Sequence, residues 1–263
     1  YIRKYHGKTM VIKYGGNAMT DPALQAAFAE DVVMLKLVGI NPVVVHGGGP
    51  QIDAALKEEE IASEFIGGFR VTTPEIFEVV ERVLVNEVGP EVVNSLRRAG
   101  VNAVALSGRT SECLIAVPLR KLVDGSPVDL GLVGGITAVN PQAINSALKG
   151  GQVPVISPIA TDENFKGGLN VNADLAAAAI AGALSAESLI IMTDVAGIYR
   201  DWPDTSSLIS SISYAELDAM KATFAEGMAP KVKACLDAID GGASAVRIID
   251  GTDPSAFAAA WPR

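Results

Sequence analysis

The chain has 263 residues, of which 49% are apolar and 5% aromatic, and it carries a formal net charge of −9. This length permits one large domain with a substantial core, and the negative charge argues against a nucleic acid or an anionic membrane surface as partner. No apolar run approaches the ~20 residues that span a bilayer, and no charged-then-apolar leader is found, so we expect a cytoplasmic protein.

Two units of strand, glycine turn and helix lie near the start of the chain. Residues 11–16 read VIKYGG and residues 43–50 read VVVHGGGP, so each apolar run stops at glycines and opens into a helical pattern. The two turns lie side by side if their strands are neighbours in a parallel sheet. Glycines let backbone N–H groups approach a phosphate closely, and two helix N-termini add their dipoles. We therefore expect a phosphoryl group over both turns.

Helices follow from capping signals and apolar spacing. Asp21 and Pro22 predict the start of the first long helix, and Thr73 and Pro74 predict the start of another, which is interrupted at Gly89 and Pro90 and resumes. Further helices are expected at residues 141–148, 174–184, 214–224 and 230–239.

Strands alternate with these helices along most of the chain. Beyond the two glycine units, strands of the main sheet are expected at residues 102–106, 153–156, 188–193 and 245–249. Residues 114–117 and 128–133 alternate like an antiparallel hairpin with a turn at Asp124 and Gly125. The alternation of strand and helix predicts an α/β fold with a mostly parallel sheet and ligands at the carboxyl ends of its strands.

The two cysteines, Cys113 and Cys235, lie in apolar surroundings and lack the spacing of metal ligands. We expect buried free thiols in a reducing compartment.

The usual nucleotide fingerprints, GxxxxGK[ST] and GxGxxG, are absent. Phosphate binding must depend on other turns. The candidate groups at strand ends and helix starts are Lys13, Gly15, Gly16, Gly47, Gly48, Gly49, Asn170, Asn172, Asp174, Asp194 and Lys231.

Two lysines among these candidates could bind the phosphoryl group. Lys13 ends an apolar strand and could equally be a solvated strand-end lysine. Lys231 lies in the first turn of a predicted helix, where a cation opposes the helix dipole at a cost of ~0.5 kcal/mol. A phosphate partner would offset that cost.

Each of the remaining polar candidates has a structural alternative. Asn172 or Asp174 could simply cap the helix, or the alternation of an extended segment could direct Asn170 and Asn172 to one ligand while Asp174 orients the lysines. Arg70 could clamp a carboxylate in a bidentate manner or lie on the surface. His46 ends a strand, where histidine is more often structural than catalytic. Tyr199 and Trp202 either pack their loop or stack on a base.

Seven segments, in order and spacing, resemble those of the amino acid kinase family. They are KYGGNAM at 13–19, VHGGGPQI at 45–52, GGFRVT at 67–72, DLGLVG at 129–134, NVNAD at 170–174, TDVAGIY at 193–199 and GMAPKV at 227–232. The resemblance implies a three-layer αβα sandwich around an open, mainly parallel sheet of about eight strands. It also implies a single domain over residues 1–263, with an acceptor-binding lobe at about 1–165 and an ATP-binding lobe at about 166–263.

The GGFRVT and NVNAD segments imply that the acceptor is N-acetyl-L-glutamate. The resemblance then implies phosphorylation of its side-chain carboxylate by ATP, a step of arginine biosynthesis, with Mg²⁺ carried by ATP and no metal ligand from the protein. It implies catalytic roles for Lys13, Lys231, Asp174 and Gly16, an acceptor site at Gly48, Gly49, Arg70, Asn170 and Asn172, and a nucleotide site at Gly15, Asp194, Val195, Gly197, Tyr199, Thr223, Phe224 and Ala225.

This chemistry suits a chain with few histidines. The acceptor carboxylate has a pKa near ~4.3 and is already ionised, so alignment and charge neutralisation suffice without a general base. The alternatives are a kinase for a related N-acyl amino acid, such as an aminoadipate derivative, and a non-catalytic nucleotide- or arginine-sensing protein of this fold. Two lysines together with Asp174 argue against a sensor. The resemblance further implies a homo-oligomer, either a dimer or a hexamer.

Overall fold

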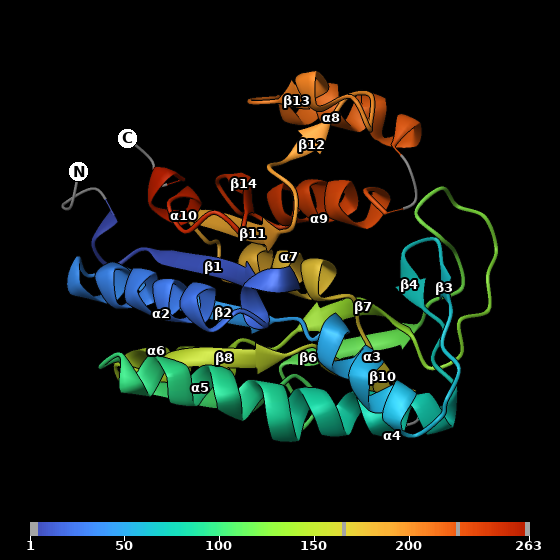
Figure 1. The fold of residues 1–263 in the computed structure, drawn as a ribbon, viewed down its shortest axis with the longest axis horizontal. Coiled ribbons are helices and arrows are strands. Elements are labelled where there is room, and N and C mark those ends of the chain that lie inside the picture. Colours follow the sequence, from blue (N-terminus) through green and yellow to red (C-terminus); the bar gives the residue numbers. More distant parts are fainter. Residues whose placement is uncertain (1–4, 165–166, 225–226, 261–263) are drawn as a thin grey trace.

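A six-stranded parallel sheet forms the centre of the molecule (Figure 1). The computed structural model describes residues 5–164, 167–224 and 227–260. Across the sheet the strands are β14 (Val246–Asp250), β11 (Ser188–Thr193), β1 (Thr9–Tyr14), β2 (Asn41–His46), β8 (Val153–Ser157) and β5 (Ala103–Ser107). The four strands whose ranges were predicted, β5, β8, β11 and β14, lie within one residue of their predicted positions. The predicted α/β fold is therefore confirmed.

The alternation of side chains along β1 assigns residues to two helical layers. Met10, Ile12 and Tyr14 belong to one core cluster, whereas Val11 belongs to the other, so Lys13 lies on the Val11 side. The first layer contains α2 (Pro22–Leu37), α3 (Gly49–Glu58), α4 (Pro74–Glu81), α5 (Gly89–Arg98) and α10 (Ala256–Ala259). The second contains α6 (Gln142–Lys149), α7 (Ala173–Ala183) and α9 (Ala229–Asp240).

The main sheet has six strands in the described part of the chain, not about eight, because four further strands form a separate sheet. Its order is β10 (Gly168–Asn170), β9 (Ile159–Asp162), β6 (Leu114–Pro118) and β7 (Gly134–Val139). The predicted strand at 114–117 is confirmed as β6, and the predicted turn is confirmed by the antiparallel bridge between Lys121 and Pro127, but β6 pairs antiparallel with β7 and not with residues 128–133. Leu130 and Val133 instead pack on Phe69 in a small cluster, so their apolar pattern reflects burial of a loop.

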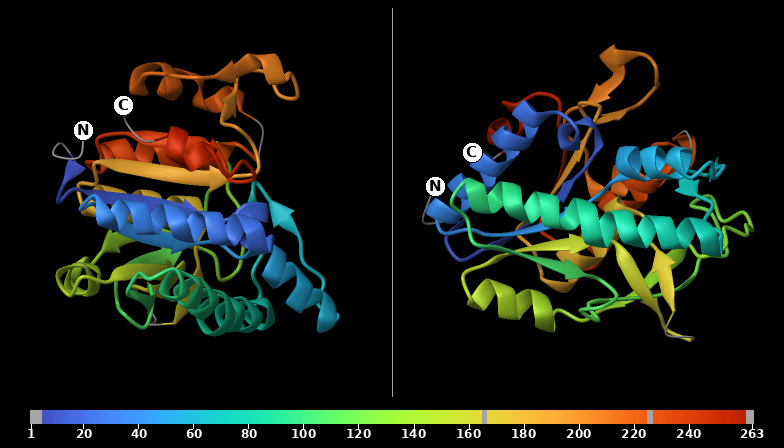
Figure 2. Two further views of the ribbon diagram at one scale, coloured as in Figure 1. Left: turned by 60° about the vertical axis from the view of Figure 1, so that its left-hand side comes forward. Right: turned by 60° about the horizontal axis from the view of Figure 1, so that its bottom comes forward.

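A π-helical segment, η2 (Arg82–Val88), joins α4 to α5, and Figure 2 shows the three as one long helical ribbon. The predicted interruption therefore lies before Gly89, not at it. Pro90 has no N–H for the helical ladder, and the wider turn lets the Gly89 N–H bond to Leu84 O. The helical segment from α4 to α5 therefore changes its hydrogen-bonding pattern at η2 but stays continuous.

Short elements complete the fold. They are η1 (Gly16–Met19), β3 (Phe65–Ile66), β4 (Phe69–Arg70), β12 (Ile198–Tyr199), η3 (Thr205–Ser207), β13 (Leu208–Ile209), α8 (Tyr214–Met220) and η4 (Lys221–Thr223). Strands β12 and β13 and helix α8 project from the rest of the molecule in the views of Figures 1 and 2. The predicted caps are confirmed, because Asp21 accepts from two N–H groups of α2 and Thr73 accepts from one of α4.

Both cysteines are free and buried, as predicted. Burial raises the pKa of Cys113 to about 11 and that of Cys235 to about 12, so both thiols stay protonated near neutral pH. None of the helices in the described residues combines the length and apolar character needed to cross a membrane.

Candidate active site

The carboxyl ends of β1, β2 and β11 define the candidate site. Strand β1 has β2 on one side and β11 on the other, so the chain reverses its direction of progress across the sheet here, which is where open α/β sheets bind ligands. Strands β1 and β2 pair over their full length, and the Gly47 N–H donates to Tyr14 O at 2.7 Å. The two glycine turns therefore lie side by side, as predicted.

A buried carboxylate joins two ammonium groups at this position. Lys13 Nζ lies 3.1 Å from Asp174 Oδ1, and Lys231 Nζ lies 2.8 Å from Asp174 Oδ2. Strand alternation directs Lys13 toward α7, where Asp174 occupies the first turn. Helices α7 and α9 approach closely, since a Cβ on Gly182 would lie 2.9 Å from Gly241 Cα. The structure thus brings together three predicted residues that are far apart in sequence.

The charges of this cluster are strongly coupled. Burial alone would raise the pKa of Asp174, but Lys13 and Lys231 outweigh it and hold that pKa down at about 2. The carboxylate is therefore ionised at neutral pH. Two ammonium groups and one carboxylate leave one positive charge, at a strand end, in a chain whose net charge is −9.

The first glycine turn is shaped around this cluster. A Cβ on Gly15 would lie 2.7 Å from Lys13 Nζ, so a side chain at this position would displace the ammonium group from its place in the cluster. Gly16 has φ +72°, and a Cβ there would lie 2.5 Å from Asp194 Oδ1. Asp194 in turn accepts a hydrogen bond from the Asn17 N–H at 2.8 Å. This contact ties the end of β11 to the turn, while a nucleotide contact of Asp194 remains a prediction.

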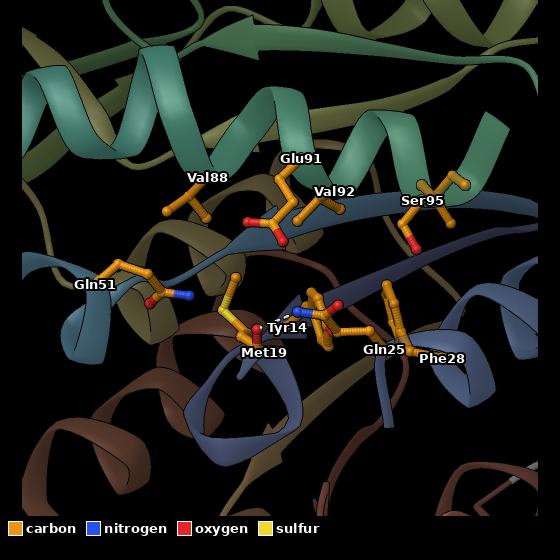
Figure 3. A pocket seen from close by; sticks show the side chains of 10 residues that line it. Tyr14, Met19, Gln25, Phe28, Gln51, Val88, Glu91, Val92 and Ser95 are labelled. Atoms are coloured by element: carbon orange, nitrogen blue, oxygen red, sulfur yellow. Dashed lines mark hydrogen bonds between the residues drawn. The ribbon is translucent and has the colours of Figure 1, made fainter. Parts of the chain in front are cut away.

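Two side chains support the same turn from its other side. The Tyr14 hydroxyl donates to Ala18 O at 2.9 Å, and Gln25 Nε2 donates to Met19 O at 2.6 Å. Figure 3 shows Tyr14, Met19 and Gln25 facing Glu91 of α5 across a narrow pocket. Burial, and after it the charge of Glu91, raises the pKa of Tyr14, so its hydroxyl keeps the proton that it donates. These two hydrogen bonds therefore stabilise turn η1.

The second glycine turn offers free N–H groups at the start of α3. Within the described part of the chain, no acceptor is found for the N–H groups of Gly48 and Gly49. A Cβ on Gly48 would lie 2.6 Å from Leu84 Cδ2, so the turn is in close contact with the π-helical segment. Two donors at a helix N-terminus beside two ammonium groups suit an anion.

Arg70 is buried and is not a surface arginine, because it is only 6% exposed. Its Nη1 lies 2.8 Å from Asp53 Oδ1 and donates to Ser63 Oγ at 2.7 Å, and its guanidinium lies 4.6 Å from the centroid of the Phe65 ring. For its Nε and Nη2, the described residues provide no acceptor. Asp53 was missed from sequence, although it lies one helical turn after the second glycine turn.

Thr72 links Arg70 to the NVNAD segment. Its hydroxyl donates to Arg70 O at 2.8 Å and accepts from Asn170 Nδ2 at 3.1 Å, so two predicted acceptor-site residues lie near each other. Asn172 caps α7, because its Oδ1 accepts from the N–H groups of Asp174 and Leu175 at 2.9 and 3.1 Å. The capping alternative therefore holds for this oxygen, and a ligand contact of Asn172 remains a prediction.

Apart from Gly15 in the first glycine turn, the described residues of the predicted nucleotide site lie on two separate segments, one after β11 and one before α9. Tyr199 is buried in β12 and meets the Trp202 ring edge to face, with centroids 5.1 Å apart, which favours the packing alternative. Ala225 lies outside the described residues. Val195 and Gly197 follow β11, and Thr223 and Phe224 follow α8.

Comparison with known proteins places this site in a family. The model of the amino acid kinase family matches residues 8–250. The chain belongs to the amino acid kinase family. The resemblance stated from the seven segments is therefore confirmed.

Among curated members of this family, two bacterial acetylglutamate kinases are similar to the chain over most of their length. The protein of Arthrobacter sp. (strain FB24) is 52% identical over 259 residues, which are 97% of this chain and 84% of the relative. The protein of Cutibacterium acnes is 51% identical over 256 residues, which are 95% of this chain and 83% of the relative.

Two solved structures show the same amino acid kinase fold. The N-acetylglutamate synthase of Neisseria gonorrhoeae, complexed with coenzyme A and N-acetyl-glutamate, superposes with a TM-score of 0.80 at 25% identity, covering 97% of this chain but 57% of the synthase. Carbamate kinase from Giardia lamblia, bound to AMP-PNP, superposes with a TM-score of 0.69 at 20% identity, covering 96% and 95%. The second likeness shows the fold alone.

The described residues of this family member contain no group of three or more His, Cys, Asp or Glu side chains able to hold a metal ion. Asp174, the buried carboxylate of the site, already contacts two ammonium groups.

Proposed function

We propose that this protein transfers the γ-phosphoryl group of ATP to the side-chain carboxylate of N-acetyl-L-glutamate, the phosphorylation step of arginine biosynthesis. Relatives named acetylglutamate kinase, about half identical over at least 95% of the chain, support this activity. The observation that carries it is the pair of ammonium groups on Asp174, beside two glycine turns, the second of which has N–H groups without an acceptor among the described residues.

In the proposed reaction a carboxylate oxygen of the acceptor forms a bond to the γ-phosphorus, and the bond to the β,γ-bridging oxygen breaks to release ADP. The acceptor is ionised at neutral pH, so no residue needs to remove a proton. Lys13 and Lys231 neutralise charge on the transferring group, and Gly48 and Gly49 donate N–H groups to it and to the acceptor. Mg²⁺ enters with ATP as part of that substrate and neutralises its phosphates.

Arg70 binds the α-carboxylate of the acceptor in this proposal. Its Nε and Nη2, which have no acceptor in the described part of the chain, form the edge of a guanidinium that suits a bidentate carboxylate, and Thr72 connects Arg70 to Asn170. The acceptor then occupies the part of the molecule formed by residues 1–165, and ATP the part formed by residues 166–263. The protein acts as a homo-oligomer, a dimer or a hexamer.

The test is ATP-dependent formation of an acyl phosphate, trapped with hydroxylamine. N-acetyl-L-glutamate, glutamate and an N-acetyl aminoadipate are compared at equal concentrations. We expect hydroxamate chiefly with N-acetyl-L-glutamate. Preference for the aminoadipate would mean that the aminoadipate derivative, not N-acetyl-L-glutamate, is the acceptor. Absence of product with all three compounds, in a protein that still binds ATP, would favour a non-catalytic sensor.

A further inference from the structure

His46 is a buried polar residue that the proposed reaction does not use. It ends β2 and is fully buried. Its Nδ1 lies 2.7 Å from Gly47 O, and its Nε2 lies 2.7 Å from Ser157 Oγ at the end of β8. The ring therefore connects two strand ends directly behind the second glycine turn.

The partners of the ring define its protonation. Burial lowers the pKa of His46 to about 4, despite the hydrogen bond to Gly47 O, which favours the charged form, so the ring is neutral near pH 7 and carries one N–H. Gly47 O can only accept, so Nδ1 must carry the proton. Nε2 then accepts, and the Ser157 hydroxyl must donate to it. Leu84 O, which lies 3.2 Å from Ser157 Oγ, receives the Gly89 N–H instead.

The peptide between Gly47 and Gly48 relates the contact of Gly47 O with the ring to the direction of the Gly48 N–H. A trans peptide is planar, and its C=O and N–H point in opposite directions. Holding Gly47 O against the imidazole therefore directs the Gly48 N–H away from the ring. That N–H has no acceptor among the described residues, and it is one of the donors in the proposed reaction.

We infer that His46 is a positioning residue: by donating from Nδ1 to Gly47 O, it aims the Gly48 N–H at the transferring phosphoryl group. This inference rests on the proposed function. Nearby packing keeps the arrangement rigid, since a Cβ on Gly89 would lie 3.3 Å from His46 Nε2 and a Cβ on Gly48 would lie 2.6 Å from Leu84 Cδ2. The π-helical segment thus closes the space into which ring and turn could relax.

The kinetic test compares two substitutions of His46 with a control on the same strand. His46→Asn retains an N–H donor at about the position of Nδ1, whereas His46→Leu removes it and keeps an apolar side chain. Val44→Ala, two residues earlier on the same face of β2 and fully buried, removes core volume but leaves Gly47 O untouched.

We expect His46→Leu to lower kcat by about 10- to 100-fold with the KM for ATP nearly unchanged. The Gly48 N–H would still be present but misdirected, so the loss in kcat should be smaller than that caused by removing a donor. His46→Asn should remain within about fivefold of wild type. Val44→Ala should lower Tm and leave kcat nearly unchanged. Equal kcat losses for His46→Asn and His46→Leu would overturn the inference, as would wild-type kcat in His46→Leu.

Nitrogen NMR of the imidazole rings tests the same inference without activity. The chain has two histidines, so the ring signals of His46 are assigned by comparison with His6→Gln. We expect a neutral ring protonated at Nδ1, unchanged from about pH 8 to about pH 5.5. A ring protonated at Nε2, or at both nitrogens, would overturn the inference. A wild-type protein that makes no hydroxamate would instead contradict the proposed function, and the ring spectrum would still report on His46.

Discussion

At the scale of single residues, Asp174 determines the charge of the site. Its carboxylate holds Lys13 and Lys231 at 3.1 and 2.8 Å and stays ionised because both ammonium groups lower its pKa. Lys13 also donates to Met192 O at 3.3 Å, so its position depends on the neighbouring strand as well. The two lysines are therefore placed before any ligand arrives.

Removing either ammonium group should reduce the proposed activity far more than removing a nearby one. We expect Lys13→Ala or Lys231→Ala to lower kcat by about two to three orders of magnitude, the usual effect of losing one preorganised donor. Lys233→Ala is the matched control, because Lys233 lies on the same helix and pairs with Asp237 at the surface. Steady-state kinetics that give Lys231→Ala the kcat of Lys233→Ala would remove Lys231 from the site.

Arg70 and Asp53 should affect acceptor binding in opposite directions. Arg70→Lys loses the planar fork and should raise the KM for the acceptor by about 10- to 100-fold with little change in the KM for ATP. Asp53 is 60% exposed at its side chain and pairs with Arg70 Nη1, so its negative charge repels a carboxylate that binds at Nε and Nη2 of the same guanidinium. We expect Asp53→Asn to lower the KM for the acceptor, since Ser63 and Phe65 still hold the guanidinium. An increased KM would mean that Asp53 orients Arg70.

At the scale of elements, the first turns of α7 and α9 bring their charges together. Asn172 caps the start of helix α7, so Asp174 lies in the first turn, within reach of Lys13 at the end of β1. Helix α9 begins with Lys231 in its first turn, a position that its own dipole disfavours. The contact with Asp174 on the neighbouring helix compensates for that placement.

Losing the cap of α7 should destabilise the protein and separate the two roles of Asn172. We expect Asn172→Ala to reduce the free energy of unfolding by about 1 kcal/mol, measured in urea, whereas Asn172→Ser should retain most of it. If Asn172 also contacts the ligand, Asn172→Ser will keep its stability and still raise the KM for the acceptor. Unchanged kinetics in Asn172→Ser would limit the residue to capping.

At the scale of the whole molecule, the site exists because the sheet places three strand ends next to one another. Strands β1 and β2 are neighbours early in the chain, and β11 joins the other edge of β1 much later. Each of the two helical layers then contributes to the site. Helix α3 supplies N–H groups from one layer, while α7 and α9 supply Asp174 and Lys231 from the other.

The buried ionisable groups predict how stability depends on pH. His46 has its pKa lowered from 6.5 to about 4, so the unfolded state binds the extra proton and stability falls as pH drops from about 6.5 through about 4. Asp174 has its pKa lowered to about 2, so its stabilisation, roughly 2–3 kcal/mol, is lost as pH falls below about 4. Urea unfolding of the wild type and of His46→Asn, measured at a series of pH values between about 6.5 and about 4.5, tests the loss of stability attributed to His46. Parallel curves between pH 6.5 and pH 4.5 would contradict it.

The local elements could be predicted because their causes act over a few residues. Asp21 with Pro22 starts α2, Thr73 with Pro74 starts α4, and β11 spans the predicted residues 188–193. The hairpin prediction failed at 128–133 because an apolar alternation reports burial and does not identify the partner strand. The predicted interruption at Gly89 lies earlier in the structure, because the π-helical segment at Arg82–Val88 accommodates the lack of an N–H in Pro90.

The order of the motifs, the units of strand, glycine turn and helix, and the charged residues could be read from the chain alone, since capping, glycine geometry and side-chain alternation are properties of neighbouring residues. Which of these residues meet depends on how the chain folds. Lys13 reaches Asp174, Arg70 is buried against Asp53, and His46 meets Ser157 through strand register and helix packing. These contacts join residues up to about 160 positions apart, and no local signal encodes a distance across so much chain.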